Sequence, residues 1–117
     1  MSDADGVLLM KDVEVCVLHP ALEGHEDRNV AFLMDGATVR VTDGVAMALA
    51  LAMVQSMRFG GSMRVDEESD ISVCDRPDDD TWTIRIGGRR IWLSRKDAYL
   101  MADAVMHAVF KAREMKA

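Results

Sequence analysis

The sequence has little of what marks a secreted or membrane-spanning protein. Its first residues, MSDADG, are small and acidic and provide no basic segment ahead of an apolar stretch, so we expect no signal peptide. The longest apolar run, from Val45 to Val54, is far shorter than the roughly 20 residues that a membrane-spanning helix needs. Cys16 and Cys74 are the only cysteines and lack Cys-x-x-Cys spacing, which favours reduced thiols. These absences predict a cytoplasmic protein without membrane contact.

The familiar patterns of metal-binding and catalytic sites are also missing. The aspartates between Asp75 and Asp80 lack the alternating order and distal glutamate of a calcium loop, and no histidine spacing fits a zinc site. Ser94 has no Gly-x-Ser-x-Gly around it, and the glycine pairs form no phosphate-binding loop. We therefore expect no catalytic residue, metal or cofactor. An enzyme would need a site assembled only in three dimensions.

What the sequence does have is a large hydrophobic fraction and a concentrated negative charge. Hydrophobic residues make up 50% of the 117 residues, which suits one compact domain over 1–117. The formal net charge is −6, and segment 66–80 alone holds eight acidic residues and one arginine. The rest of the chain is therefore nearly neutral. Such a run is either a solvated loop or a surface that presents phosphate-like charge to a basic partner.

Two parts of the chain resemble each other. Residues 30–57 align without gaps on residues 82–109, and weaker upstream similarity extends the repeats to about 6–59 and 61–114. Each copy has two alternating runs around a two-residue turn, followed by a helical apolar pattern. The sequence therefore predicts an α+β fold of tandem duplicated units, ββββα or βββα twice, with antiparallel sheets packed on two helices. The alternative is a chain of two unrelated hairpin–helix units.

The turns and helix starts of the two copies have matching chemistry. Asp35-Gly36 and Gly87-Gly88 are pairs that type I′ hairpin turns prefer, because both central residues need a positive φ. A Thr or Ser then stands where a helix N-cap is expected, at Thr42 and Ser94.

Counting outward from the turns separates a core face from an outer face in each hairpin. The predicted core-facing residues are Val30, Phe32, Met34, Val39 and Val41 in the first hairpin and Trp82, Ile84, Ile86, Ile91 and Leu93 in the second. The outer faces differ: they carry Ala31, Leu33, Thr38 and Arg40 in the first, and Thr83, Arg85, Arg90 and Trp92 in the second. Residues that break the repeat on an outer face are candidates for partner contact.

The two predicted helices differ in the same way. The second has a polar stripe, Asp103, His107, Lys111 and Glu114, opposite an apolar face. The first is apolar nearly all the way round between Val45 and Val54. Either other elements of the fold cover this helix, or it meets a second copy or another protein. The second alternative predicts a homodimer interface at Met47, Leu51 and Val54.

Two resemblances bear on function. A duplicated ββββα arrangement resembles the topology of the Whirly and PUR-repeat single-strand nucleic-acid-binding proteins. That resemblance implies a curved sheet whose exposed face stacks bases, with Arg85, Arg90, Trp92 and the counterpart Arg40 on that face. In small size, acidity and lack of catalytic signatures, the chain also resembles phage-encoded inhibitors such as anti-CRISPR proteins.

These observations predict a non-enzymatic protein–protein interaction module, encoded by a phage or mobile element, that inhibits a partner complex by blocking its basic, nucleic-acid-binding surface. Single-stranded nucleic-acid binding through residues 82–93 is the alternative, and the net charge opposes it. The predicted partner-binding residues are Arg40, Asp66, Glu67, Glu68, Asp70, Asp78, Asp79, Asp80, Arg85, Arg90 and Trp92.

Overall fold

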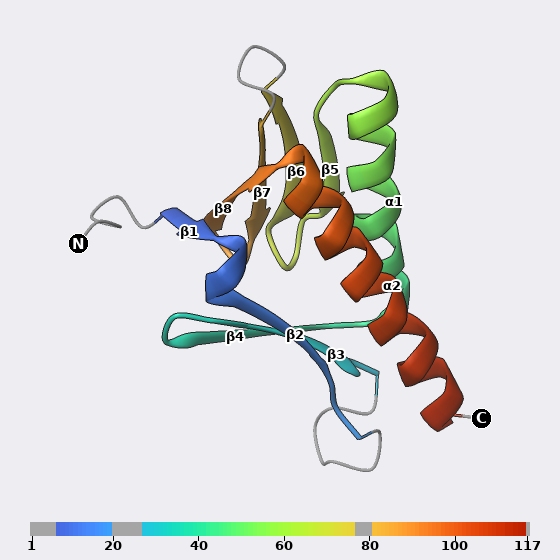
Figure 1. Cartoon of the computed structure of the whole chain (residues 1–117). Coiled ribbons are helices and arrows are strands. Elements are labelled where there is room, and N and C mark those ends of the chain that lie inside the picture. Colours follow the sequence, from blue (N-terminus) through green and yellow to red (C-terminus); the bar gives the residue numbers. More distant parts are fainter. Residues whose placement is uncertain (1–6, 20–26, 77–80, 117) are drawn as a thin grey trace.

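The structure is a computed structural model of the chain, and it describes residues 7–19, 27–76 and 81–116. The described part is α+β, as predicted, and has eight strands and two α-helices (Figure 1). In chain order the elements are β1 (Val7–Leu9), the short 3-10 helix η2 (Met10–Asp12), β2 (Val13–Val17), β3 (Val30–Met34), β4 (Ala37–Val41), α1 (Asp43–Phe59), β5 (Met63–Asp66), β6 (Ile71–Arg76), β7 (Thr81–Ile86), β8 (Arg89–Ser94) and α2 (Arg95–Lys116).

The strands form two sheets whose order departs from a simple repeat. The five-stranded sheet has the order β1-β8-β7-β6-β5, and the three-stranded sheet has the order β2-β3-β4. All neighbouring strands are antiparallel except β1, which pairs parallel to β8. The order ββββα therefore occurs twice along the chain, but the first strand of the first unit joins the sheet of the second unit. A common origin of the two units stays a prediction.

The two hairpin turns do not share one conformation. Gly87 and Gly88 both have positive φ, 59° and 82°, which confirms the turn predicted there. In the first hairpin only Gly36 is left-handed, with a φ of 71°, so the type I′ prediction for Asp35-Gly36 is wrong. The strain of a left-handed conformation at Asp35 is avoided because the neighbouring glycine alone supplies the positive φ.

The helices begin where the sequence predicts and run in opposite directions. The Oγ1 of Thr42 accepts a hydrogen bond from the Val45 amide (3.1 Å), and the Oγ of Ser94 accepts one from the Asp97 amide (3.2 Å). At one end of the pair Arg113 of α2 binds Asp43 at the start of α1. At the other end Arg95 of α2 donates to the carbonyl of Met57 near the end of α1. Neither helix is long and apolar enough to cross a membrane, among the residues described.

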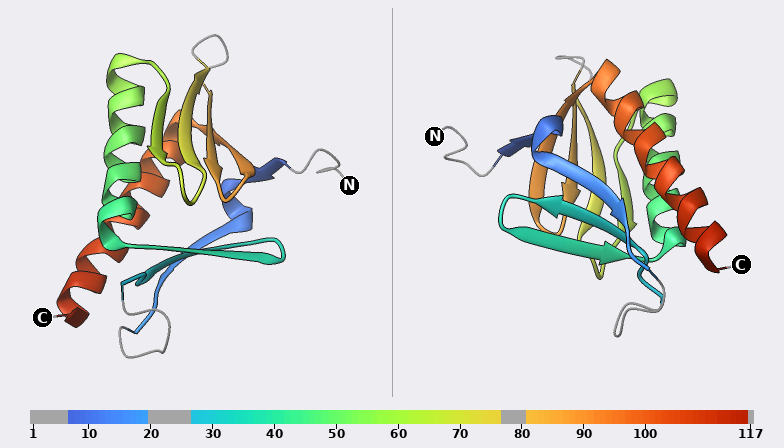
Figure 2. Two further views of the ribbon diagram at one scale, coloured as in Figure 1. Left: turned by 180° about the vertical axis from the view of Figure 1, so that it is seen from behind. Right: turned by 60° about the horizontal axis from the view of Figure 1, so that its bottom comes forward.

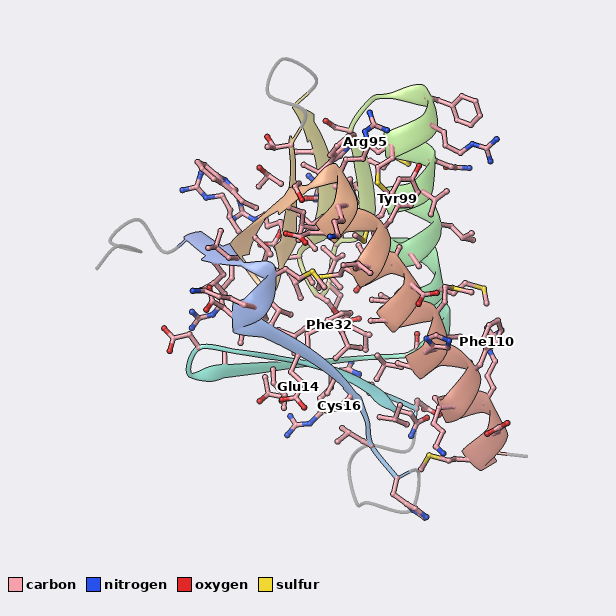
Figure 3. The ribbon with its side chains drawn as sticks, in the orientation of Figure 1. Glu14, Cys16, Phe32, Arg95, Tyr99 and Phe110 are labelled. Atoms are coloured by element: carbon pink, nitrogen blue, oxygen red, sulfur yellow. The ribbon has the colours of Figure 1, made fainter. Side chains whose placement is uncertain are left out.

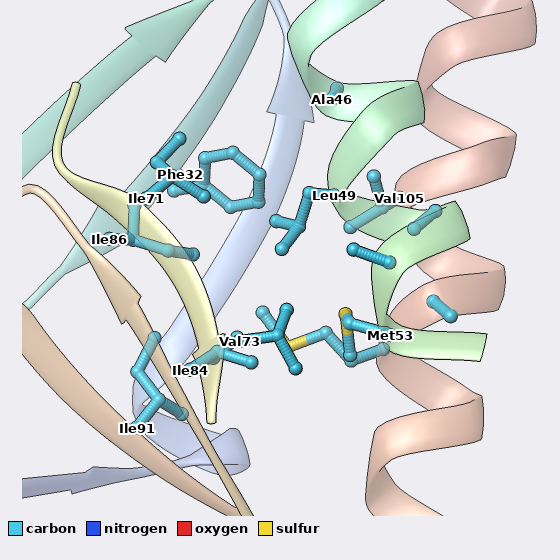
Figure 4. Packing of buried hydrophobic residues seen from close by; sticks show 14 of the residues in the cluster. Phe32, Ala46, Leu49, Met53, Ile71, Val73, Ile84, Ile86, Ile91 and Val105 are labelled. Atoms are coloured by element: carbon cyan, nitrogen blue, oxygen red, sulfur yellow. The ribbon is translucent and has the colours of Figure 1, made fainter. Parts of the chain in front are cut away.

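The core lies between the two sheets and the helices. Phe32 points from β3 into this space (Figure 3), where Leu49 and Met53 of α1 meet Val73 and Ile84 of the larger sheet (Figure 4). All the predicted core-facing residues of both hairpins are buried except Val39, which is half-buried. Ala31, predicted on the outer face, is fully buried. Its methyl group is small, and it lies on the central strand between Cys16 and Arg40.

Candidate partner-binding surface

No helix in the described part of the chain covers one face of the five-stranded sheet. Both helices lie on its other side (Figure 2), against which the buried residues of β6, β7 and β8 pack. The strand register places the outward side chains in two rows across the sheet. We call these eight residues the outer sheet face: Leu9, Trp92, Thr83 and Cys74 in the first row, and Arg90, Arg85, Ser72 and Arg64 in the second.

The first row contains an exposed apolar pair. Trp92 and Leu9 are register partners on adjacent strands and are 50% and 47% exposed. Cys74, at the other end of the row, is exposed and forms no disulfide. Tryptophan in a half-exposed position keeps much of its large apolar surface in contact with water, and covering that surface would stabilise a complex.

The second row is basic and meets the acidic turn, which we define as residues 66–70 between β5 and β6. Arg85 binds the carboxylate of Asp70 at 3.0 Å, and Arg64 approaches Glu67 at 3.9 Å. Arg90 is the register partner of Arg85. The acidic turn therefore lies at one end of the outer sheet face and partly neutralises its arginines.

The other side of the acidic turn faces the three-stranded sheet. Arg28 approaches Glu68 at 3.4 Å, and Arg40 shares with Glu68 and Asp70 a cleft of about 530 Å³. Arg40 was predicted as the first-hairpin counterpart of the outer arginines. The structure places it across the acidic turn from Arg85 instead, on a separate sheet.

The described part of the acidic segment is not an unopposed negative patch. Glu67, Glu68 and Asp70 each contact an arginine of the chain, and the Asp66 carboxylate accepts a hydrogen bond from the Ser69 amide (3.0 Å). The ion pairs are solvent-exposed, so each contributes only about 0–1 kcal/mol and can exchange for another cation at low cost. Three further predicted residues lie outside the described residues: Asp78, Asp79 and Asp80.

The structure thus places Arg85, Arg90 and Trp92 on one sheet face beside the acidic turn, and it places Arg40 on the other sheet. It also adds neighbours that sequence reasoning missed. Leu9 was missed because nothing local predicts that β1 pairs with β8. Arg28 and Arg64 were missed because their acidic partners are identified only by the fold. The alternating pattern of residues 63–66 was the one local signal that could have placed Arg64 on an outer face.

The predicted dimer residues lie along the outer side of α1. Leu51 is 54% exposed, whereas Met47 and Val54 are half-buried. The guanidinium of Arg113, on α2, reaches the Met47 sulfur at 4.0 Å. Helix α2 therefore covers part of this side of α1, in line with the expectation that other elements of the fold cover the helix. It leaves Leu51 exposed.

Two observations on the described residues bear on metal binding and on nucleophilic chemistry. No three potential metal ligands come together among them. Burial and, second, the nearby Glu14 carboxylate raise the pKa of the Cys16 thiol, which favours the thiol over the nucleophilic thiolate.

Comparison of this chain with protein-family models, curated proteins and solved structures found no match.

Proposed function

We propose that this protein is a non-enzymatic interaction module that binds a partner protein through the outer sheet face. The observation that carries the proposal is the exposed pair Trp92 and Leu9 beside Arg90 and Arg85 on an uncovered sheet. Tryptophan and arginine are the residue types most enriched among those that dominate binding energy at interfaces. A central apolar anchor with a polar surround also matches the usual anatomy of such interfaces.

The module would act as an inhibitor by occupying a surface of its partner. The acidic turn supports a basic partner surface, because the exposed carboxylates of Glu67 and Glu68 can exchange their arginines for cations of the partner. Surfaces that bind nucleic acids are positively charged. A protein that blocks such a surface would act as a phage-encoded anti-defence protein does. The free cysteines support the cytoplasm as its compartment.

We expect Trp92→Ala to weaken partner binding at least about 30-fold, which corresponds to the roughly 2 kcal/mol that defines an interface hot spot. The partner is first recovered with the wild-type protein from host cells and identified by mass spectrometry, and its affinity is then measured by calorimetry. Tyr99→Ala is the matched control, since Tyr99 is an exposed aromatic residue on α2. Equal affinities of the two variants would contradict binding through the outer sheet face.

Single-stranded nucleic-acid binding is the second candidate, favoured by the row of Arg90, Arg85 and Arg64 beside Trp92. Stacking of a base on an aromatic ring with arginines at the phosphates is a common mode of such binding. If this candidate is right, labelled single strands should bind at low salt in a fluorescence-anisotropy assay, and Trp92→Ala should weaken binding about tenfold. Absence of binding by any strand would exclude it.

A further inference from the structure

Helix α2 carries an exposed stripe on the side opposite its buried face. The buried residues include Met101, Val105 and Val109, which pack into the core. At 100° per residue the stripe lies about half a turn of the helix away from them. Its six residues are all exposed: Lys96, Leu100, Asp103, His107, Phe110 and Glu114.

Two members of this α2 stripe are large and apolar. Leu100 is 48% and Phe110 55% exposed, and Figure 3 shows Phe110 projecting away from both sheets. Successive members are four, three, four, three and four residues apart. That alternation is the spacing with which one helix packs along another in a coiled coil. The α2 stripe therefore has the spacing of a helix-packing seam, with two of its six positions apolar, and the described residues of a single chain leave it exposed.

The order of residues along the α2 stripe indicates that a second copy of the same helix can pack on it. Suppose that the α2 helices of two copies pack side by side in opposite directions, with their centres at the level of Val105. Lys96 of one copy then faces Glu114 of the second copy, and Leu100 faces Phe110 of the second copy. Asp103 then faces His107 of the second copy. Each contact occurs twice by symmetry, as an isologous interface requires. Lys96 and Glu114 then meet with opposite charge, and Asp103, which approaches His107 of its own chain at 3.5 Å, also faces the imidazole of the second copy. Apolar groups meet between these layers.

A parallel pairing would instead set Lys96, Asp103 and Glu114 each against its own copy, and like charges in contact are destabilising. The charge order thus selects the antiparallel arrangement. We propose that two copies of this chain associate through antiparallel packing of their α2 stripes. The proposal goes beyond the binding of a partner protein through the outer sheet face, which lies on other elements. The two surfaces adjoin where Leu9 and Leu100 line one cleft.

Charge reversal on the full-length chain tests the proposal, with the dimer dissociation constant measured by sedimentation equilibrium. Lys96→Glu sets two glutamates against each other, and Glu114→Lys sets two lysines against each other, so each should raise the constant about tenfold. The double variant restores unlike pairs and should return the constant to within about threefold of the wild-type value. Phe110→Ser should raise it about 100-fold.

Leu51→Ser is the control, because Leu51 is an exposed leucine on α1 and lies outside the α2 stripe. We expect it to leave the dissociation constant unchanged. A monomer at every accessible concentration would overturn the proposal. So would a dimer that Leu51→Ser dissociates and that the α2 variants leave intact, which would assign the interface to Met47, Leu51 and Val54. Failure of the double variant to recover would refute the antiparallel register.

Discussion

Replacing Gly87 with alanine should lower the free energy of unfolding by about 2–5 kcal/mol. Gly87 has a φ of +59°, where a residue with a β-carbon is strained by about 1–2 kcal/mol. A β-carbon at this position would also lie 2.5 Å from Cγ2 of Val39, so the turn, β4 or the Val39 side chain must move. Overpacking of this kind typically costs a further ~1–3 kcal/mol.

The matched control is Gly36→Ala in the first hairpin. Gly36 also has a positive φ, +71°, but a β-carbon there meets no atom within 4 Å. In Gly36→Ala the free energy of unfolding should fall only by the cost of the left-handed backbone conformation, about 1–2 kcal/mol. Urea unfolding followed by circular dichroism measures both. Equal losses would show that the β7–β8 turn does not press on β4 as the structure places it.

The Gly87 turn also connects the two sheets beside the candidate surface. Its amide donates to the carbonyl of Ser69 in the acidic turn at 2.9 Å, and its Cα faces Val39 of the smaller sheet. Asp70, next to Ser69, holds Arg85. A shift of this turn in Gly87→Ala should therefore disturb the end of the outer sheet face as well as stability.

The local features of this fold could be predicted from the sequence because their causes are local. The alternation of apolar and polar residues predicted which side of β7 and β8 is buried, because Ile84 and Ile91 lie on the same face of the hairpin. The hydroxyls of Thr42 and Ser94 marked the helix starts because an N-cap needs only its own first turn. These signals predicted the hairpin and the helix of each unit, and they left open whether three or four strands precede each helix.

Long-range features could not be predicted in the same way. Strand β1 has only three residues, too short for alternation to show a partner, and its pairing with β8 depends on the completed sheet. The acidic run was interpreted as one negative surface because a count of charges along the sequence includes only residues that are close in sequence. In the fold Glu68 meets Arg28, forty positions away, and Asp70 meets Arg85. These contacts change the candidate site from a negative patch into a mixed surface around Trp92.

Ser56→Ala should lower the free energy of unfolding by about 1–3 kcal/mol, the cost of leaving a buried donor without its partner. The Ser56 hydroxyl accepts a hydrogen bond from Nε1 of Trp82 at 3.0 Å and donates one to the Gly61 carbonyl at 2.8 Å. Both side chains are buried, so water cannot replace the lost oxygen without entering the core. The sequence placed Trp82 in the core but could not identify this partner, which lies on α1.

A double-mutant cycle separates this hydrogen bond from simple loss of packing. Trp82→Phe removes the donor, so in that background Ser56→Ala should cost less, by about 1 kcal/mol, than in the wild type. Guanidinium unfolding of the four proteins by circular dichroism gives the coupling directly. If the two substitutions lower the free energy of unfolding additively, the Ser56 hydroxyl contributes to stability only through its hydrogen bond to Gly61. Coupling would show that the Trp82 ring, which Arg95 also covers at 5.1 Å, is fixed in place by the end of α1. The same end would then hold the start of α2, because Arg95 is the first residue of that helix.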